Sequence, residues 1–526
     1  MDYMDYLKEM GLARHWVPIF VGLLAFYFIM ERSTANASRT SLPIVKHFKL
    51  LPPFFNRILY VVKAPFLIYY GYEKYKSKPF RILKLDGDLV VLPQKYLEEV
   101  GGLHSRQASL VEYPGRMYQH THKQRVAGAH CFGEVESSFG LLLHQISHYM
   151  LCISADFQII DRQIPRLLFE LHHAFSAVVP YCEGRYVPIN LYHMILKLVT
   201  HSTSRIIIGQ RLCRSEQWIN TITKCTYDVR IAVKQLQLVP RFLRRLAAPF
   251  LPSVQRLETQ LRWIAEQLIL PMIQHRRRRE LNDPSYKKQE DFLQWMMDLA
   301  DNDLDRDPMN LAYGLMITMA LAVVQTSTML ITHAMYDLMV HPEYLEPLRE
   351  EIHETLTNGW IRASLSDFGA QRRLDSFLHE SQRLNPPSEV SAQRVLGRPL
   401  TLSDGVTLPK GTHVCFPSGP MSRDPTVVPD PLTFDGFRWC KDLNAPDGSL
   451  TDVSPANLHF GFGGQACHGR FFGAVIAKAV MSRLLAEYDL KFEEGQSGRP
   501  ENIVNGEQIM PSISTKVLIK KKNVDI

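Results

Sequence analysis

The sequence lacks any pair of cysteines in a CxxC arrangement, although eight cysteines are scattered through its 526 residues. This irregular spacing argues against a zinc site and a disulfide scaffold, and it favours a reducing compartment. No internal repeat or low-complexity tract is present, which excludes solenoid and disordered chains. The net charge of +7 is too small to indicate nucleic-acid binding, but it is compatible with a membrane surface or an acidic partner.

Charge is missing from one run near the N-terminus. Residues His15–Met30, HWVPIFVGLLAFYFIM, are uncharged over 16 residues and would form a helix of about 24 Å, which suits a thin bilayer such as the endoplasmic reticulum. A cleaved signal peptide is the alternative, because Ala35–Ala37 resembles a cleavage site. Net negative residues before the run and basic residues after it argue against cleavage and place the body in the cytosol. We expect a lumenal N-terminus (1–14), a single-pass anchor (15–31), a linker (32–54) and one folded domain (55–526).

Proline is absent between Pro308 and Pro342, an interval with one glycine. A helix filling it would be about 50 Å long, and it should be buried because it is apolar nearly all round. Thr326 lies in its middle. A buried threonine usually bonds to the carbonyl one turn earlier, and the alternative is that Thr326 faces a cavity. Segments before this helix are also mostly helical, and Arg276–Arg279 is expected to be a solvated helix end.

Glu380 and Arg383 are three residues apart, so both lie on one face of a helix. Such a pair is usually exposed and contributes well under about 1 kcal/mol. This helix also carries leucines and a phenylalanine, so part of it should be buried. A buried arginine would need a full set of acceptors.

The segment Phe460–Gly473, FGFGGQACHGRFFG, contains the one cysteine framed by glycines, Cys467. A helix should begin close after it, so backbone N–H groups and the positive helix end would favour a thiolate. Glycines would let a large planar group lie close to the backbone. A thiolate that ligates haem iron fits these needs; the alternative is a structural cysteine beside a tight turn.

The order of these motifs resembles a cytochrome P450: ExxR (Glu380, Arg383), FxxxR (Phe434–Arg438) and FxxGxxxCxG (Phe460–Gly469). The segments GYEKYKSKPFR, THAMYDLMVHPEYLEPLREEI and GRFFGAVIAKAVMSRLLAEYDLKF are similar to membrane-bound fungal monooxygenases of secondary metabolism, including those that oxidise gibberellin and indole-diterpene skeletons. The resemblance implies a mainly helical P450 catalytic domain with a small β-rich subdomain, behind the anchor.

The resemblance also implies roles for single residues. Cys467 would be the axial thiolate ligand of haem b, Phe460 would pack near its sulfur, and Gly463 and Gly469 would shape the loop. Candidates for the haem propionates are Arg394 and Arg125. A buried cluster of Glu380, Arg383 and Arg438 would hold the haem-binding core together. Thr326 and Gln325 would be catalytic residues beside the iron.

Four positions depart from the family pattern. Val323 stands where a small residue is usual, and we expect it to narrow the cavity beside Thr326. Gln325 replaces the usual acid and cannot donate a proton as an acid would. Gln465 replaces a basic residue that often meets a propionate, and His468 replaces an apolar residue or proline. These last two departures put one propionate contact and the shape of the proximal face in doubt.

The resemblance implies a monooxygenase that inserts one oxygen atom into a C–H bond of an apolar, terpenoid or mixed-terpenoid substrate. Electrons would come from NADPH through a cytochrome P450 reductase, with cytochrome b5 as a second candidate partner. Two alternatives stay open: a reductase-independent isomerase or dehydratase, and a haem-binding sensor without turnover. Pocket residues are expected in four segments: His104–Tyr118, Leu315–Thr326, Pro387–Gln393 and Gln508–Ser512.

Overall fold

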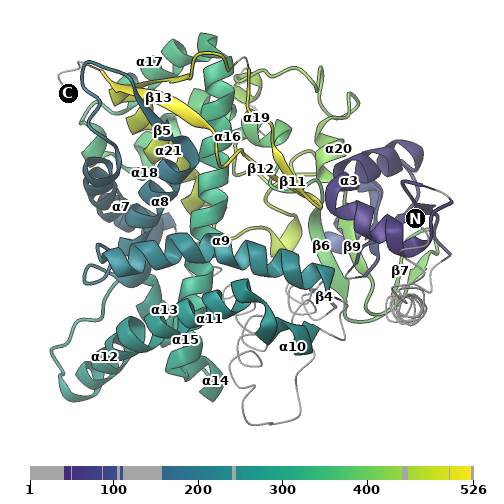
Figure 1. Cartoon of the computed structure of the whole chain (residues 1–526), viewed down its shortest axis with the longest axis horizontal. Coiled ribbons are helices and arrows are strands. Elements are labelled where there is room, and N and C mark those ends of the chain that lie inside the picture. Colours follow the sequence, from purple (N-terminus) through teal and green to yellow (C-terminus); the bar gives the residue numbers. More distant parts are fainter. Residues whose placement is uncertain are drawn as a thin grey trace, which may run out of the picture.

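The computed structural model describes residues 41–48, 50–85, 87–103, 107–109, 157–239, 244–440, 448–496 and 498–522. The expected anchor, Arg125 and most of the segment His104–Tyr118 lie outside these residues. Figure 1 shows helices gathered around one long central helix, and a strand-rich part at the end of the molecule that carries α3. The architecture is therefore mainly helical with small sheets, as expected.

The longer helices are α3 (Pro53–Lys74), α7 (Phe157–Val178), α8 (Leu191–Ile208), α9 (Glu216–Leu238), α11 (Pro252–Ile264), α12 (Leu270–Asn282), α15 (Pro308–Ile317), α16 (Thr326–Val340), α17 (Leu345–Thr355), α19 (Arg372–Leu384) and α21 (Arg470–Glu487). The shorter ones are α4 (Leu97–Gly101), α10 (Arg244–Ala247), α13 (Phe292–Leu299), α14 (Asp303–Arg306), α18 (Leu365–Ala370) and α20 (Ser418–Ser422).

A six-stranded sheet has the order β1-β2-β3-β9-β6-β4. Its strands are β1 (Ile44–Val45), β2 (Phe80–Ile82), β3 (Leu89–Val91), β9 (His413–Phe416), β6 (Ser391–Leu396) and β4 (Ala108–Ser109). A three-stranded sheet contains β10 (Tyr488–Phe492), β13 (Lys516–Lys521) and β5 (Val187–Asn190), and two hairpins complete the set: β7 (Leu400–Thr401) with β8 (Thr407–Leu408), and β11 (Ile503–Asn505) with β12 (Gln508–Met510). β6 bulges between Ser391 and Arg394, where Ala392 has φ 46°.

The central helix runs from Pro308 to Val340 without a break and fills the proline-free interval, as predicted. Asp307 caps its N-terminus by accepting from the backbone N–H of Met309 (3.0 Å) and Asn310 (2.9 Å), and Pro308 occupies the first turn, where no N–H is needed. Its apolar composition would suffice to cross a membrane, yet 78% of its most apolar window is buried inside the protein, as expected for a core helix. Between α15 and α16 the helix widens into the π-helical segment η5 (Thr318–Gln325).

The expectation for Arg276 is wrong. Its guanidinium is buried and forms two bonds to the Asp291 carboxylate, at 2.7 and 2.6 Å, and Asp291 in turn caps α13. The buried carboxylate arrives from a segment 15 residues later in the chain, so nothing within the run of arginines indicates that its first member turns inward.

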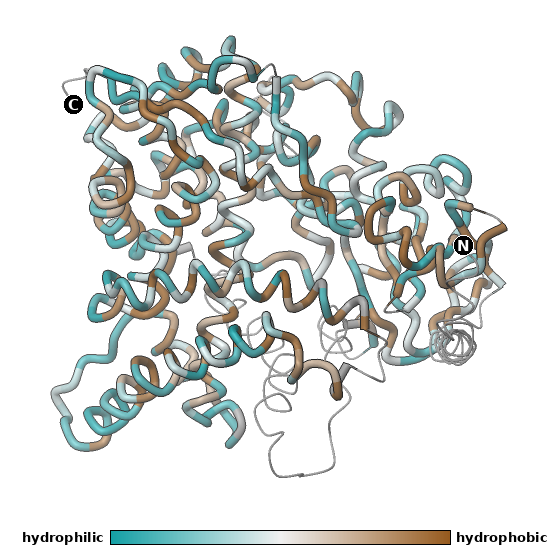
Figure 2. Tube along the Cα trace, in the orientation of Figure 1, coloured by the Kyte–Doolittle hydropathy of each residue, from teal (hydrophilic) through white to brown (hydrophobic). Residues whose placement is uncertain are grey.

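Helix α3 presents an apolar face to solvent. Five of its side chains, each at least 40% exposed, follow one another at spacings of three or four residues and so share one face: Phe55, Ile58, Val62, Phe66 and Tyr69. Figure 2 shows stretches of hydrophobic residues, in brown, in the part of the chain near the N label. A contiguous exposed apolar face of this kind marks a contact surface for a membrane or another protein.

Candidate active site

The cysteine loop depends on a glycine at one close contact. Gly463 has φ 67°, and a Cβ atom there would lie 2.4 Å from the carbonyl oxygen of Gly101 in α4. The backbone N–H of Cys467 donates to the carbonyl of Phe460 at 2.6 Å, which closes the loop, and Gly469 caps α21. The structure therefore brings Phe460, Gly463 and Gly469 around Cys467.

The Cys467 side chain is exposed, while protein packed around the loop gives its sulfur a partly desolvated setting. This burial raises the pKa of the thiol, whereas backbone N–H groups of Gly469 and Arg470 and the Arg470 cation act in the opposite direction. Arg470 is fixed by bonds to the carbonyls of Thr451 (3.0 Å) and Cys467 (2.9 Å). The donors at the start of α21 thus suit a thiolate, and metal coordination would remove the proton outright.

Thr326 lies on an accessible part of an otherwise buried helix. Its side chain and that of Ala322, one turn earlier, are exposed, whereas Val323, Val324 and Ser327 are buried. The Thr326 hydroxyl donates to the Ala322 carbonyl at 2.7 Å. Thr326 therefore bonds back to the previous turn, and its side chain is also accessible; that it faces a cavity stays a prediction. Gln325, which is half-buried, closes the π-helical segment; such segments are frequent at functional sites.

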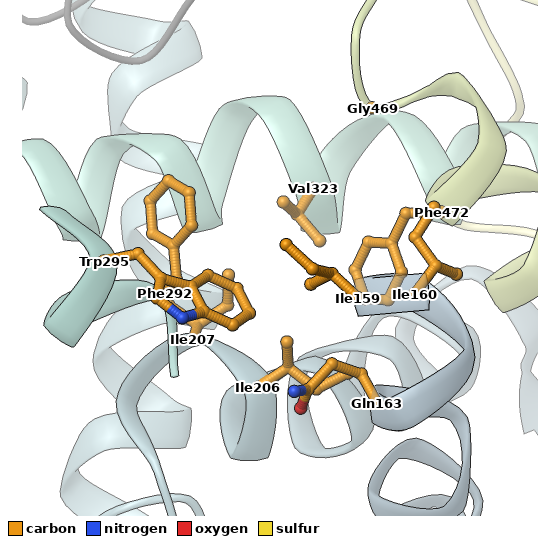
Figure 3. Close-up of a pocket in the computed structure, with 10 residues that line it drawn as sticks. All are labelled: Ile159, Ile160, Gln163, Ile206, Ile207, Phe292, Trp295, Val323, Gly469 and Phe472. Atoms are coloured by element: carbon orange, nitrogen blue, oxygen red, sulfur yellow. The ribbon is translucent and has the colours of Figure 1, made fainter. Parts of the chain in front are cut away.

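Val323 does not share that accessible face. Its buried side chain lines an apolar cavity of about 40 Å³, together with Gly469 and Phe472. Figure 3 shows Val323 pointing toward Phe472 and the isoleucines of α7, with Phe292 and Trp295 at the other end. The residues lining this cavity include neither Ala322 nor Thr326, so the expected narrowing beside Thr326 stays a prediction. The shared cavity does place the π-helical segment next to the start of α21.

The Glu380 carboxylate is completely buried and accepts five hydrogen bonds. Arg383 donates two of them in a fork, at 2.8 and 2.7 Å, and Arg438 donates one at 3.2 Å. The backbone of Asp435 (3.1 Å) and the indole of Trp439 (3.1 Å) donate the others. The predicted members Glu380, Arg383 and Arg438 are thus in direct contact.

Both arginines of this cluster also find backbone acceptors in the segment between α20 and Arg438. Arg383 donates to the carbonyls of Ser422 (2.9 Å) and Pro431 (2.6 Å), and Arg438 donates to those of Pro429 (2.5 Å) and Thr433 (2.9 Å). The cluster therefore binds α19 to the loop that leads toward Cys467.

Sequence reasoning missed Trp439. Its indole N–H bonds to Glu380, and its ring stacks on His379 with centroids 4.2 Å apart. An indole N–H that is removed from water needs a hydrogen-bond acceptor. A tryptophan directly after Arg438 could therefore have indicated a further donor to the Glu380 carboxylate.

Arg394 is almost fully buried, and none of the described residues supplies it with an anionic partner. Its Nη2 donates to the carbonyl of Phe462 (2.9 Å), and its Nη1 to that of Gln393 (2.8 Å), while Nε has no partner among the described residues. Burial lowers the pKa of this arginine to about 10. Gln465, the neighbouring candidate, donates to the Ala108 carbonyl at 2.8 Å.

These observations test whether the site fits haem. A cysteine with helix-terminal donors can supply an axial thiolate, and glycines in the loop permit close approach of a planar ring. A buried guanidinium without a counter-charge suits a propionate. The accessible Ala322–Thr326 face offers a second surface on the π-helical segment. The residues present therefore fit a thiolate-ligated haem; Arg125 lies outside the described residues.

Residues 173–519 match the cytochrome P450 family. The cytochrome P450 monooxygenase paxP of Penicillium paxilli is 40% identical over 498 residues, which is 94% of this chain and 93% of that protein. The cytochrome P450 monooxygenase penP of Penicillium crustosum is 40% identical over 524 residues, or 99% and 98% of the two chains. AtmP of Aspergillus flavus, of the same description, is 39% identical over 521 residues, or 99% and 97%. The chain therefore belongs to the cytochrome P450 family and is a cytochrome P450 monooxygenase.

Proposed function

We propose that the protein is a haem-thiolate enzyme of fungal secondary metabolism that inserts one atom of dioxygen into an apolar terpenoid or mixed-terpenoid substrate. The observation that carries this proposal is Cys467, which is accessible at its side chain and lies just before α21, where the backbone N–H groups of Gly469 and Arg470 favour the thiolate. The near full-length similarity to fungal P450 monooxygenases supports the class. The terpenoid substrate rests on the resemblance to the indole-diterpene and gibberellin enzymes.

Haem b, when bound, supplies oxygen activation and the transfer of one oxygen atom to carbon. Cys467 would hold it from one side through its thiolate. Arg394 would neutralise a propionate, which would complete the hydrogen bonding of its Nε. Arg125 is the second propionate candidate, and Gln465 offers an amide where a cation is usual. Phe460, half-buried beside the loop, would shield the sulfur from water.

Thr326 and Gln325 are the proposed catalytic residues on the opposite side. The Thr326 hydroxyl donates its hydrogen bond to the Ala322 carbonyl, so its oxygen remains able to accept a hydrogen bond from a water molecule and hold that water in place. Gln325 can orient water but cannot supply a proton, because an amide does not ionise near neutral pH. Proton delivery at this site therefore depends on water held by Thr326.

Electrons would come from NADPH through a membrane-bound cytochrome P450 reductase, docked on the side of the molecule that carries the Cys467 loop. Cytochrome b5 is the second proposed electron donor. We place the enzyme at the endoplasmic reticulum membrane, with residues 15–31 as a single-pass anchor and residues 55–526 as the cytosolic catalytic domain. The exposed apolar face of α3 supports a membrane-associated body.

The first test is a reduced carbon-monoxide difference spectrum of the membrane-expressed protein and of Cys467→Ala. The parent should give the strongly red-shifted Soret band of thiolate-ligated haem, and Cys467→Ala should lose it. Cys440→Ala is the matched control, because the Cys440 thiol is half-buried and donates to the nearby Phe437 carbonyl at 3.4 Å. A band retained in Cys467→Ala, or no haem in the parent, refutes the assignment.

A second test separates oxygen insertion from the isomerase or dehydratase alternative, which the changed segment at Val323 and Gln325 leaves open. Under labelled dioxygen, a monooxygenase product gains one labelled atom and requires reductase and NADPH. Product formed without reductase and without label would establish the alternative. Binding of apolar ligands without product would instead indicate the sensor.

A further inference from the structure

A buried polar cluster lies on the central helix beyond Thr326. His333 and Asp337, one turn apart on α16, are 2% and 3% exposed, and both contact Arg499 from the C-terminal segment. Arg499 Nε donates to Asp337, and its Nη2 lies 2.7 Å from His333 Nδ1. The guanidinium is thus held in a fork between two side chains of the helix that carries the proposed catalytic threonine.

Residues of α19 and of the C-terminal segment complete the cluster. The second Asp337 oxygen accepts from Ser381 (2.5 Å) and Asn385 (3.1 Å). Asn502 accepts from Arg499 Nη1 at 2.8 Å and donates to Asn385 at 2.8 Å. A closed ring of hydrogen bonds therefore links α16, α19 and the chain just before β11.

The chemistry of this cluster indicates a role other than stability. Because His333 Nδ1 accepts from the arginine, its ring proton is on Nε2, which is buried without a partner among the described residues. Burial, with the Arg499 charge nearby, holds the pKa of His333 well below its usual value, so the ring is neutral. Buried ion pairs often contribute little net stability compared with apolar packing, and an unpaired N–H costs more. What such a cluster provides is a fixed geometry.

The segment that this geometry fixes is the β11–β12 hairpin. Arg499 lies four residues before β11, and just after β12 the Ser512 carbonyl accepts from Tyr336 of α16 at 3.0 Å. Helix α16 therefore contacts both ends of residues 499–512, through His333 and Asp337 at one end and Tyr336 at the other. Figure 1 shows β11 and β12 lying between this helix and the strand-rich part.

The hairpin also pairs with a second segment expected at the substrate pocket. The backbone N–H of Glu389 donates to the Glu507 carbonyl (2.8 Å), and Ile509 N–H donates to the Pro387 carbonyl (3.3 Å). Residues 387–390 lead directly into β6 and Arg394. The segments Pro387–Gln393 and Gln508–Ser512 are thus one unit, and the Arg499 fork sets the position of that unit relative to Thr326.

We propose that Arg499 is a positioning residue for substrate selectivity, which acts by fixing the β11–β12 hairpin to the helix that carries Thr326. The proposal rests on the haem-thiolate function proposed above. Without the fork, the hairpin keeps its backbone pairing with residues 387–390 and the Tyr336–Ser512 bond, but the end that leads into β11 can shift relative to α16. The shape of the pocket changes, whereas the haem site built around Cys467 does not.

The test uses membrane-bound full-length protein, Arg499→Met and Arg499→Lys, and three probes of one composition but different shape: 1-, 2- and 4-phenylimidazole. Dissociation constants are read from the Soret shift, and the ratios among the three probes report pocket shape regardless of how much protein is folded. We expect at least one ratio to change about fourfold or more in Arg499→Met, the factor for one misplaced methylene. Arg499→Lys should give a smaller change, because lysine reaches Asp337 but cannot also bond His333.

Arg349→Met is the matched control. Arg349 is similarly half-buried and bonds to Asp489 (2.7 Å) and to the carbonyls of Leu485 (2.9 Å) and Tyr488 (3.1 Å), away from the hairpin. Its loss should lower stability but leave the ratios unchanged. Unchanged ratios in both Arg499 variants, or equal changes in Arg349→Met, would overturn the proposal. If Arg499→Met does not fold, Arg499→Lys decides alone. A parent protein without a thiolate spectrum would instead refute the proposed function.

Discussion

Replacing Glu380 with glutamine should destabilise the protein more than any change to a surface ion pair. The substitution keeps one acceptor oxygen but places an amide N–H₂ group where an oxygen now accepts from neighbouring donors. It also leaves the buried guanidinium of Arg383 and the largely buried one of Arg438 without a counter-charge. Breaking a buried charge pair in this way costs about 3–5 kcal/mol.

That loss of stability corresponds to a measurable shift in the midpoint temperature of thermal unfolding. The unfolding entropy is about 2.1 cal/mol/K per residue, here over roughly 470 residues. A loss of about 1 kcal/mol in the free energy of unfolding therefore lowers the midpoint temperature of thermal unfolding by about 1 °C. Glu380→Gln should therefore unfold about 3–5 °C below the parent, followed by circular dichroism of the detergent-solubilised protein. The same variant should lose its carbon-monoxide band over the same temperature range, because the cluster binds α19 to the loop before Cys467.

The control is Glu350→Gln on the surface of α17. Glu350 is 68% exposed on its side chain and lies 3.9 Å from Arg373, so its loss should cost less than about 0.5 kcal/mol. Equal midpoints for the two variants would refute the reasoning, because they would mean that burial and the five donors add nothing to the Glu380 interaction.

Three further predictions follow from the site. Thr326→Ala should keep substrate binding but raise the NADPH and oxygen consumed per product, measured as hydrogen peroxide released; unchanged coupling would reduce Thr326 to a back-bonded helix residue. Arg394→Met should raise the midpoint of the haem-free protein, since it removes a buried charge without a counter-ion, and should speed haem transfer to apomyoglobin; slower transfer would contradict the propionate contact. Burial and nearby positive groups lower the pKa of His459 to about 3, so the folded ring stays neutral while the unfolded ring protonates below about pH 6.5. As the pH falls from about 6.5 to about 3, the free energy of unfolding should decrease by up to about 1.4 kcal/mol per pH unit. In acid unfolding, His459→Phe should reduce this dependence of the free energy on pH.

The sequence predicted features whose causes are local. The central helix followed from an interval without proline. The pairing of Glu380 with Arg383 needed only helical spacing and apolar neighbours on the same helix. The position of Cys467 before a helix followed from the glycines around it.

Features made by distant segments could not be predicted in the same way. Arg276 turns inward because Asp291 arrives from the next helix, and Arg383 is satisfied by carbonyls almost 50 residues away. Val323 is buried against Gly469 and Phe472, which lie almost 150 residues later in the chain, and the π-helical segment that carries it had no signal in the sequence. The fork around Arg499 gave no local signal, since His333 and Asp337 lie more than 160 residues earlier in the chain.

The exposed apolar face of α3 has a practical consequence for handling the protein. A version shortened by its first 40 residues would still carry Phe55, Ile58, Val62, Phe66 and Tyr69 on one accessible surface. In detergent-free buffer such surfaces pair with each other, so shortening alone should yield aggregates rather than monomers. Crystallisation or scattering experiments would then need polar substitutions on α3 itself, and the positions that tolerate them are the ones that face outward.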